Sequence, residues 1–286
     1  MALNLVFKQQ ALLANGGKVK VKKNFAKWLY SHNAQRIYEK ELVALTKQIN
    51  KISLDLVSPR LLSLVEEAKV ERSDNSELKL DLGLVDAVKE IIQATVFSSS
   101  SFINDPTLNE LSGQQAARIS TYNKSQLNKV IYSAVKVNPI MAEPYLRPQI
   151  ELFQAQNSAL IKKLSAEQAA RMEGTLFRNL AAGNGVKVIR EEIAKNFKIG
   201  ENRARLIARD QTNKFNGDLA QLRQQELGIG EYWWSGSLDE RERQTHLDNE
   251  RKHFTWNKPS VITGHPGSQI RCRCTAQPIL TDEMFL

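Results

Sequence analysis

Histidine and cysteine, which are common zinc ligands in proteins, gather near the end of the chain. Three of the four histidines and both cysteines lie within the last 41 of 286 residues. Cys272 and Cys274 can supply two thiolates. His246 and His265 can supply two imidazoles, which completes the N2S2 donor set of a tetrahedral structural zinc site. These four residues are therefore the candidate ligands of a structural zinc ion, which is one of two interpretations of this segment.

The spacing of the two cysteines leaves a metal-free alternative open. Only one residue separates Cys272 from Cys274, whereas zinc modules usually place two to four residues between paired cysteines. In the alternative, reduced thiols are buried as small apolar groups within a hydrogen-bonded turn. A disulfide between such close neighbours would be strained and close almost no loop, so we expect none. A metal ion would supply folding free energy to a segment with little core of its own.

A second group of polar residues, Asp239-x-Arg241-x-Arg243-x-x-His246, precedes the cysteines. One hypothesis is that Asp239, His246 and His265 form the site of a metal-dependent nuclease or of a DNA-binding protein. In the nuclease, His246 would act as the general base and Asp239 would bind a cation. Hydrolytic metal sites normally need several converging carboxylates, which this segment lacks. The structural alternative pairs Asp239 with Arg241 or Arg243 in a bidentate contact that fixes the local turn. We expect the structural role and no catalytic residue.

Aromatic residues surround this polar group. Tyr232, Trp233 and Trp234 are consecutive, and Trp256 follows. They could stack on nucleic-acid bases, but such residues more often form the core of a small subdomain, which is the role that we expect. Because side chains alternate along a strand, Trp233 and Trp234 should face opposite ways.

The elements that must position these residues are mainly helical. Apolar residues recur every three or four positions through most of the chain before Gly230, which is typical of amphipathic helices. After Gly230 the chain is rich in aromatic, turn-forming and charged residues. The predicted fold class is therefore mainly α, with a helical N-terminal region and a C-terminal α+β domain that ends in a small irregular β-containing subdomain.

Several punctuation signals predict where helices begin and end. Asp105-Pro106 is a start signal, and Ser165 with Gln168 matches a capping box that would begin another helix. Gly183 and Gly200 are predicted to end helices. Three prolines between 139 and 148 suggest a boundary. The predicted division is a basic N-terminal arm (1–32), a helical region (33–148) and a C-terminal domain (149–286) with helices over 165–228 and the β-containing subdomain over 230–286.

The positive charge of the chain is concentrated in its first 51 residues. The formal net charge of +9 divides into +8 for residues 1–51, −1 for 52–186 and +2 for 187–286. Such a local positive field favours DNA or an acidic protein surface as a neighbour, although a merely solvated surface is the alternative. Residues 18–23 within it are predicted to form a short exposed strand or an arm. Its candidate contact residues are Lys18, Lys20, Lys22, Lys23 and Lys27.

The overall composition is that of a globular protein and excludes fibrous and low-complexity classes. Hydrophobic residues make up 42% and charged residues 25% of the chain. The N-terminus lacks the pattern of a secretion signal, and no apolar run approaches the ~20 residues of a membrane span. We therefore expect no membrane partner.

Taken in order, the motifs resemble those of the phage Mu F-like family of minor head proteins, also called head morphogenesis proteins. The resemblance covers roughly residues 151–280, and nothing distinctive precedes it. Its marks are Trp234, the Asp239 to His246 run, His265-Pro266-Gly267, Cys272-Arg273-Cys274 and Pro278, together with Arg205, Ala208, Arg209 and Asn213 on the preceding helix. The sequence departs from the family at Asp248 to His253, where a glycine-containing turn is common, so the role of His253 is left open.

The resemblance implies a protein of a tailed bacteriophage virion that is made in the host cytoplasm. Such a protein would act in head morphogenesis by binding rather than catalysis. It would associate with the portal protein, the major capsid protein or both, at the portal vertex or the capsid interior. Packaged phage DNA is a further expected partner, with a role in DNA packaging or ejection.

Overall fold

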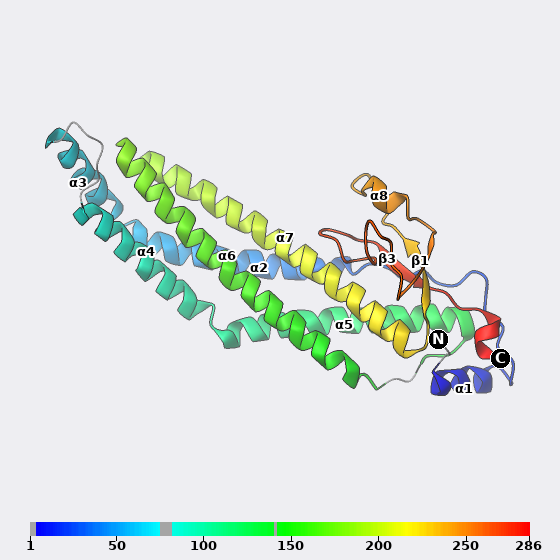
Figure 1. Cartoon of the computed structure of the whole chain (residues 1–286). Coiled ribbons are helices and arrows are strands. Elements are labelled where there is room, and N and C mark those ends of the chain that lie inside the picture. The colour runs from blue at the N-terminus through cyan, green and yellow to red at the C-terminus, as the bar shows by residue number, and fades with distance from the viewer. Residues whose placement is uncertain (1–3, 75–81, 140–141) are drawn as a thin grey trace. The chain divides into compact units, whose positions relative to one another are not determined.

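The described part of the chain is mainly helical, as Figure 1 shows for the computed structural model. The structure describes residues 4–74, 82–139 and 142–286. Its long helices precede a small antiparallel sheet in the C-terminal part, and one short helix lies between the strands of that sheet, so the predicted fold class is confirmed. None of the described helices combines the length and the apolar character needed to cross a bilayer.

The helices range from one short turn to 41 residues. They are α1 (Leu5–Ala14), α2 (His32–Val57), α3 (Leu61–Asp74), α4 (Leu82–Phe102), α5 (Asp105–Val135), α6 (Arg147–Ala182), α7 (Val186–Glu226) and α8 (Gln244–Leu247), with 3-10 turns η1 (Pro144–Leu146) and η2 (Asp282–Phe285). The predicted helix start at Asp105-Pro106 is confirmed, but Asp105 is not the N-cap. The Asn104 side chain caps this helix by accepting from the backbone N–H of Thr107 at 3.0 Å.

The sheet contains β1 (Glu231–Ser235), β2 (His253–Thr255) and β3 (Thr275–Pro278). The central strand β1 pairs antiparallel with both others in the order β2-β1-β3. Trp233 lies opposite His253 on one side and Gln277 on the other. The sheet therefore joins the aromatic run to the end of the chain, as the expectation of β structure after Gly230 required.

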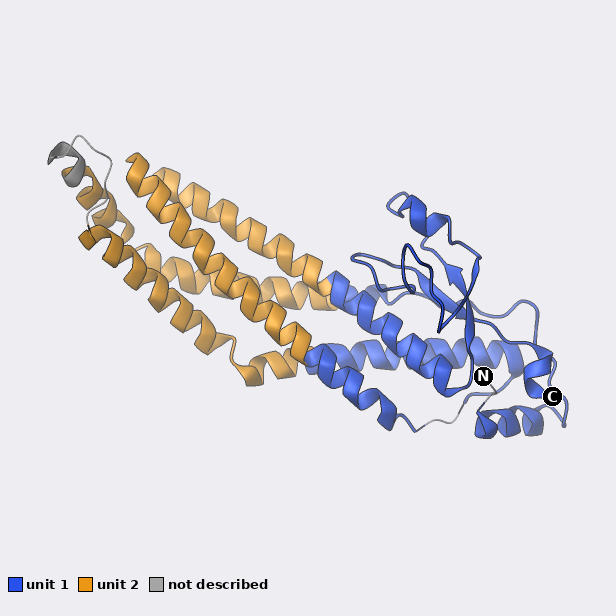
Figure 2. Ribbon diagram, viewed as in Figure 1, with its two compact units in different colours: residues 1–36, 113–154, 209–286 blue, residues 37–112, 155–208 orange. Residues whose placement is uncertain are grey.

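The described residues fall into two compact units, coloured separately in Figure 2. Each unit is assembled from segments that are distant in sequence. Unit 1 contains residues 1–36, 113–154 and 209–286, and unit 2 contains residues 37–112 and 155–208. The predicted division into arm, helical region and C-terminal domain stays a prediction.

Unit 2 is helical and is held together by two apolar clusters. One includes Leu84, Val88 and Ile91 of α4 with Leu176 and Ile189, all nearly inaccessible to solvent. The other includes residues of α2, α6 and α7 and is accompanied by a buried hydrogen bond of 2.7 Å from Tyr38 Oη to Asn157 Oδ1. Burial of apolar stripes of this kind is what stabilises helices of modest intrinsic propensity.

Two predicted helix boundaries in this unit are wrong. Ser165 does not start a helix, because α6 runs without a break from Arg147 to Ala182. Gly200 does not end one, because α7 continues to Glu226. A Cβ at Gly200 would lie 2.4 Å from the Gln168 side chain, so this glycine permits a close approach between α6 and α7. The stop at Gly183, whose φ is +71°, is confirmed.

Residues 18–30 of the basic N-terminal segment are anchored in the unit 1 core, and the exposed strand predicted over residues 18–23 is wrong. Val19 and Trp28 are buried, and residues 18–30 form no strand. The backbone N–H of Val21 donates to Asp282 Oδ1 at 2.6 Å, and that of Trp28 donates to Gln277 Oε1 at 2.6 Å. Apolar residues between the lysines therefore anchor the segment, whereas the lysine side chains stay exposed.

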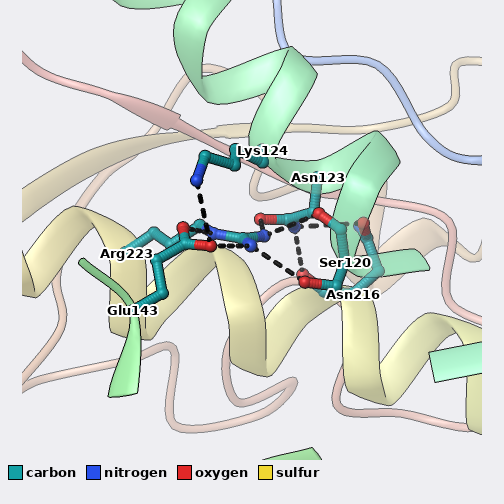
Figure 3. A network of polar contacts seen from close by, with 6 residues as sticks. All are labelled: Ser120, Asn123, Lys124, Glu143, Asn216 and Arg223. Atoms are coloured by element: carbon teal, nitrogen blue, oxygen red, sulfur yellow. Dashed lines mark hydrogen bonds and ion pairs between the residues drawn. The ribbon is translucent and has the colours of Figure 1, made fainter. Parts of the chain in front are cut away.

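A buried arginine organises the polar interior of unit 1 (Figure 3). Arg223 on α7 has no exposed side-chain surface. All five of its N–H groups donate hydrogen bonds, at 2.7 to 3.1 Å, to Glu143, Asn123 and the hydroxyl and carbonyl oxygens of Ser120. Lys124 reaches the same Glu143 carboxylate at 3.3 Å. The network ties α5 and α7 to the segment that precedes η1.

The network should make unit 1 sensitive to one substitution. Arg223→Met removes two hydrogen bonds from the half-buried Glu143 carboxylate and one from the buried Asn123 amide, so we expect a loss of about 3–5 kcal/mol in the free energy of unfolding. All four tryptophans lie in unit 1, so urea unfolding followed by tryptophan fluorescence reports this unit. The control Arg147→Met removes an exposed pair with Glu151 and should cost under about 1 kcal/mol. Equal effects of the two variants would contradict the role of the network.

The same network predicts an acid-dependent loss of stability. Burial raises the pKa of Glu143, but the Arg223 hydrogen bond and charge outweigh burial and hold that pKa below its ordinary value of 4.5. A carboxyl with a lowered folded pKa contributes stability that is present above 4.5 and lost as the pH falls through the folded pKa. The urea midpoint of the tryptophan transition should therefore fall more steeply below pH 4.5 in the wild type than in Glu143→Gln.

Candidate functional site

The C-terminal knob, residues 230–286, is built around the predicted aromatic core. Tyr232, Trp234 and Trp256 are nearly inaccessible to solvent. The rings of Tyr232 and Trp256 lie 4.4 Å apart between centroids, and Trp234 meets His246 edge to face at 5.5 Å. Trp234 is 1% exposed and Trp233 is 45% exposed, which confirms that they face opposite ways. The predicted core role of the aromatic cluster is thereby confirmed.

The loop that carries His265-Pro266-Gly267 lies directly on α7. A Cβ at Gly217 of α7 would be 2.8 Å from the carbonyl oxygen of Pro266. A Cβ at Gly267 would be 2.9 Å from the carbonyl oxygen of Asn213. Gly267 also has a φ of +95°, which side chains disfavour. The two glycines therefore let the loop and helix backbones touch, and they fix the loop that leads to the cysteines.

Three of the four predicted zinc ligands come together. His246 Nδ1 lies 3.2 Å from Cys274 Sγ and 3.6 Å from Cys272 Sγ. The ligand atoms of these residues all lie within 4.8 Å of one another, and all three residues are buried. Both cysteines are free thiols, as expected. The cluster therefore joins α8 to the segment just before β3.

The cluster favours a thiolate on Cys272. Hydrogen bonds from Cys274, from His246 and from the Gly267 N–H at 3.3 Å lower the pKa of Cys272 below its ordinary value. The interaction with Cys272 raises the pKa of Cys274, and burial adds to this effect. The Cys272 sulfur raises the pKa of His246. These shifts favour a thiolate on Cys272 beside a protonated thiol on Cys274.

A second set of contacts orients the His246 ring. Its Nε2 lies 3.0 Å from Gln269 Oε1. Arg243 Nη1 donates to the same oxygen at 2.9 Å, and Arg243 Nη2 donates to the carbonyl of Ile270. Gln269 Nε2 is in turn anchored to the carbonyl of Ile262 at 3.0 Å. Arg243 thus braces the loop that holds the histidine, instead of pairing with Asp239 as the sequence suggested.

The remaining predicted ligand, His265, is not part of the cluster of donors found among the described residues. Its Nδ1 lies 2.9 Å from Tyr232 Oη, and its ring lies 5.0 Å from that of Trp256. Burial lowers its pKa, which favours a neutral imidazole within the aromatic core. His253, whose role the sequence left open, lies 3.1 Å from Glu231 and against the Trp233 ring.

Asp239 pairs with Arg273, the residue between the two cysteines, rather than with Arg241 or Arg243. The contact is bidentate, with one oxygen 2.7 Å from Nη2, and the backbone N–H of Arg241 donates to Asp239 at 3.1 Å. The hydrogen bond from Arg273 holds the pKa of Asp239 below its ordinary value. Among the described residues, Asp239, His246 and His265 do not form one donor cluster, so the geometry offers the nuclease hypothesis no assembled metal site.

A cavity of about 600 Å³ opens beside the cluster within unit 1. Five arginines and one carboxylate line it. The lining residues are His32, Gln35, Arg209, Asn213, Ser237, Arg241, Glu242, Arg243, His246, Arg271, Cys272, Arg273 and Cys274. Most of the sequence motifs therefore converge on one cationic surface, although Trp234 and His265 lie in the core beneath.

Some lining residues were missed by sequence reasoning. His32 and Gln35 precede the knob by about 200 residues, and no local pattern connects them with it. A signal did exist for α7, because Arg209, Asn213 and Gly217 recur every four residues and so share one helical face. Arg271 has a φ of +60°, an unfavourable conformation for a residue with a side chain.

These features define a mainly helical protein that carries a small sheet-containing knob with a histidine–cysteine cluster and an arginine-lined cavity. Residues 170–277 match the family described as Phage Mu protein F like protein. This match confirms the resemblance that the motifs predicted for this part of the chain.

An uncharacterized protein of Haemophilus influenzae is similar to the chain. The two are 32% identical over 167 residues, which is 58% of this chain and 36% of the relative. The chain thus matches just over a third of that protein's length. No solved structure matches the chain.

The glycine contact between loop and helix can be tested by adding one methyl group. Gly217→Ala should lower the free energy of unfolding by about 1–3 kcal/mol, because the new Cβ forces the loop and α7 apart. Gly174→Ala in α6 has open space around its Cβ and should stabilise by roughly 0.5–1 kcal/mol. Urea unfolding followed by far-ultraviolet circular dichroism measures both. Stabilisation by both substitutions would contradict the close contact.

Proposed function

We propose that this protein is a minor head protein of a tailed bacteriophage that acts in head morphogenesis by binding rather than catalysis. The observation that carries the proposal is the Mu F-like segment, residues 170–277. The structure adds a physical argument, because the polar residues of the predicted nuclease site brace loops or the aromatic core. Asp239 is neutralised by Arg273, and His265 is bonded to Tyr232.

The knob suits a role as a rigid attachment part. Its core is aromatic, its loop is fixed on α7, and Arg243 spans from its own segment to Gln269 and Ile270. A surface held in one conformation loses little entropy when it binds a partner. In our proposal the partner is the portal protein, the major capsid protein or both, and the protein resides in the virion head.

The basic segment offers a surface for packaged DNA. Lys18, Lys20, Lys22, Lys23 and Lys27 are all exposed, and none forms an ion pair within the described residues. Buried neighbours hold the backbone, so the charges are presented from a folded surface. Lysines that contact DNA release counterions, and this release makes binding favourable and dependent on salt.

Replacing these five lysines with glutamine should weaken DNA binding without unfolding the protein, because their side chains make no core contact. Each lost phosphate contact lowers the slope of log K against log salt by about 0.9, so the slope should fall by up to about 4 to 5. Fluorescence anisotropy with a labelled duplex at several salt concentrations measures this slope.

A matched control uses five exposed lysines of unit 2 that lie outside residues 1–51, namely Lys69, Lys89, Lys163, Lys187 and Lys198. Their replacement changes the net charge by the same amount, so a local contact predicts a clearly smaller change in slope. Equal slopes for both variants would show that only total charge matters and would remove the basic segment as a DNA surface.

The assignment to the virion has a direct test. Particles should be produced from a strain that carries the coding sequence, purified as heads, and analysed by mass spectrometry. We expect the protein at a constant low ratio to the major capsid protein in these heads. Its consistent absence from heads, with abundant protein in the lysate, would contradict the proposed function.

A further inference from the structure

The separations between the three clustered donors match those around a zinc ion. Bond lengths of about 2.3 Å to sulfur and about 2.0 Å to nitrogen, at a tetrahedral angle, place sulfur and nitrogen about 3.5 Å apart. His246 Nδ1 lies 3.2 Å from Cys274 Sγ and 3.6 Å from Cys272 Sγ. Two soft thiolates with one imidazole favour zinc over harder ions. The three side chains thus supply three of four tetrahedral positions.

The surroundings of His246 are those of a metal-binding imidazole. When Nδ1 is the ligand, the proton lies on Nε2 and donates to Gln269 Oε1, 3.0 Å away. Ligand histidines nearly always make such an outer hydrogen bond to an oxygen, because it fixes the tautomer and the ring orientation. Arg243 and the carbonyl of Ile262 hold Gln269 in place. Gln269 is therefore a positioning residue for the ion.

No fourth protein ligand belongs to the cluster among the described residues. Glu242 lies nearest, with Oε1 at 3.3 Å from Cys274 Sγ, but its carboxylate also accepts the backbone N–H of Leu238 at 2.5 Å. Because His246, Cys272 and Cys274 all line the cavity, an ion that they hold lies at the cavity wall. Its fourth position is then available to a ligand from the cavity.

The charges of the cavity indicate what that ligand is. Asp239 neutralises Arg273, and Arg243 bonds to neutral oxygens. Arg241 and Arg271 are exposed at this surface and pair with no carboxylate of the described chain. Guanidinium groups bind phosphate oxygens in a bidentate manner, and they carry their charge at any physiological pH. Arg241 and Arg271, beside a doubly charged zinc ion, therefore favour a ligand with anionic oxygen atoms.

A buried amide without a partner gives independent support. Asn213 of α7 lines the cavity and is 2% exposed. Both its Oδ1 and its Nδ2 lack a hydrogen-bond partner among the described residues. Leaving such groups unsatisfied costs about 1–3 kcal/mol, so buried amides normally have partners. A phosphate oxygen in the cavity would be an acceptor for Nδ2.

We propose that His246, Cys272 and Cys274 bind one zinc ion at the wall of the arginine-lined cavity, and that a phosphate group from the cavity occupies its fourth position. Arg241, Arg271 and Asn213 recognise the other oxygens of that phosphate. The shared chemistry admits two sources, a phosphate of a nucleic-acid strand and free inorganic phosphate. The site is independent of the proposed virion role, since either can fail without the other.

The metal part is tested by zinc content. Protein purified without chelator should contain about one zinc per chain, and the cobalt-substituted protein should show an intense sulfur-to-cobalt charge-transfer band. Cys272→Ser, Cys274→Ser and His246→Gln should lose both. Gln269→Leu should weaken zinc binding by about 10–100-fold. Zinc-free wild-type protein that also gives no cobalt band would overturn the proposal.

His265→Gln is the matched control, because His265 lies outside the donor cluster. We expect this variant to keep its zinc and its cobalt band. Loss of metal in a His265→Gln protein whose helix content is unchanged would show that His265 is a ligand, and it would overturn the three-donor site. Circular dichroism of every variant separates loss of metal from loss of fold.

The anion part is tested with the cobalt-substituted protein. Inorganic phosphate or a short single-stranded oligonucleotide should shift the visible bands of the wild-type protein. The double variant Arg241→Gln with Arg271→Gln should bind cobalt equally but respond at least about tenfold more weakly. Arg190→Gln with Arg203→Gln, which removes two exposed arginines of unit 2, should respond as the wild type does.

The two anions distinguish the sources of the phosphate. A shift with the oligonucleotide at concentrations where inorganic phosphate has no effect indicates a nucleic-acid phosphate, and a shift with phosphate alone indicates the free ion. An unchanged spectrum with both anions would overturn the phosphate site. An equal response of both double variants would overturn the role of Arg241 and Arg271.

Discussion

The candidate site depends on a place where two backbones touch with no side chain between them. Gly217 of α7 and Gly267 of the knob face each other there, and a Cβ on either would lie within 3 Å of a carbonyl oxygen. This contact fixes the loop from which Gly267 donates its N–H to Cys272. It also brings the face of α7 that carries Asn213 to the cavity. The geometry of the histidine–cysteine cluster therefore depends on the packing of this loop against α7 as well as on contacts within the cluster.

Two buried polar side chains on α7, Arg223 and Asn213, differ in how many of their polar groups have hydrogen-bond partners within the described chain. Arg223 uses all five of its N–H groups within the protein, so it is saturated and stabilises unit 1. Asn213 lies ten residues earlier on the same helix and uses neither polar atom of its side chain within the described chain. A buried polar side chain whose hydrogen bonds are all made within the protein contributes to the fold. A buried polar side chain that lacks partners and lines a cationic cavity is instead available to a ligand in that cavity.

Residue types in the sequence predicted the fold class, the aromatic core and all three clustered donors. The prediction that His265 is a zinc ligand rested on a count of four potential ligands, which is the number that a tetrahedral site needs. In the structure His265 instead packs in the aromatic core. Local signals failed at Ser165 and Gly200, where packing on both sides of α6 and α7 overrides capping and breaking tendencies. Contacts across long stretches of sequence, such as those of the basic segment with Asp282 and Gln277, leave no local pattern to read.

The distribution of the two units along the chain sets the order in which they can be completed during synthesis. All residues of unit 2 precede residue 209, whereas unit 1 needs both the first 36 residues and the last 78. The segment that carries Trp28 must wait for Gln277, some 249 residues later, before its backbone N–H finds an acceptor. Domains tend to fold as they emerge from the ribosome, so unit 2 can fold first. The cavity and its donors include residues up to Cys274, so they form only after unit 2, and the candidate binding surface does not exist on a chain that has completed unit 2 alone.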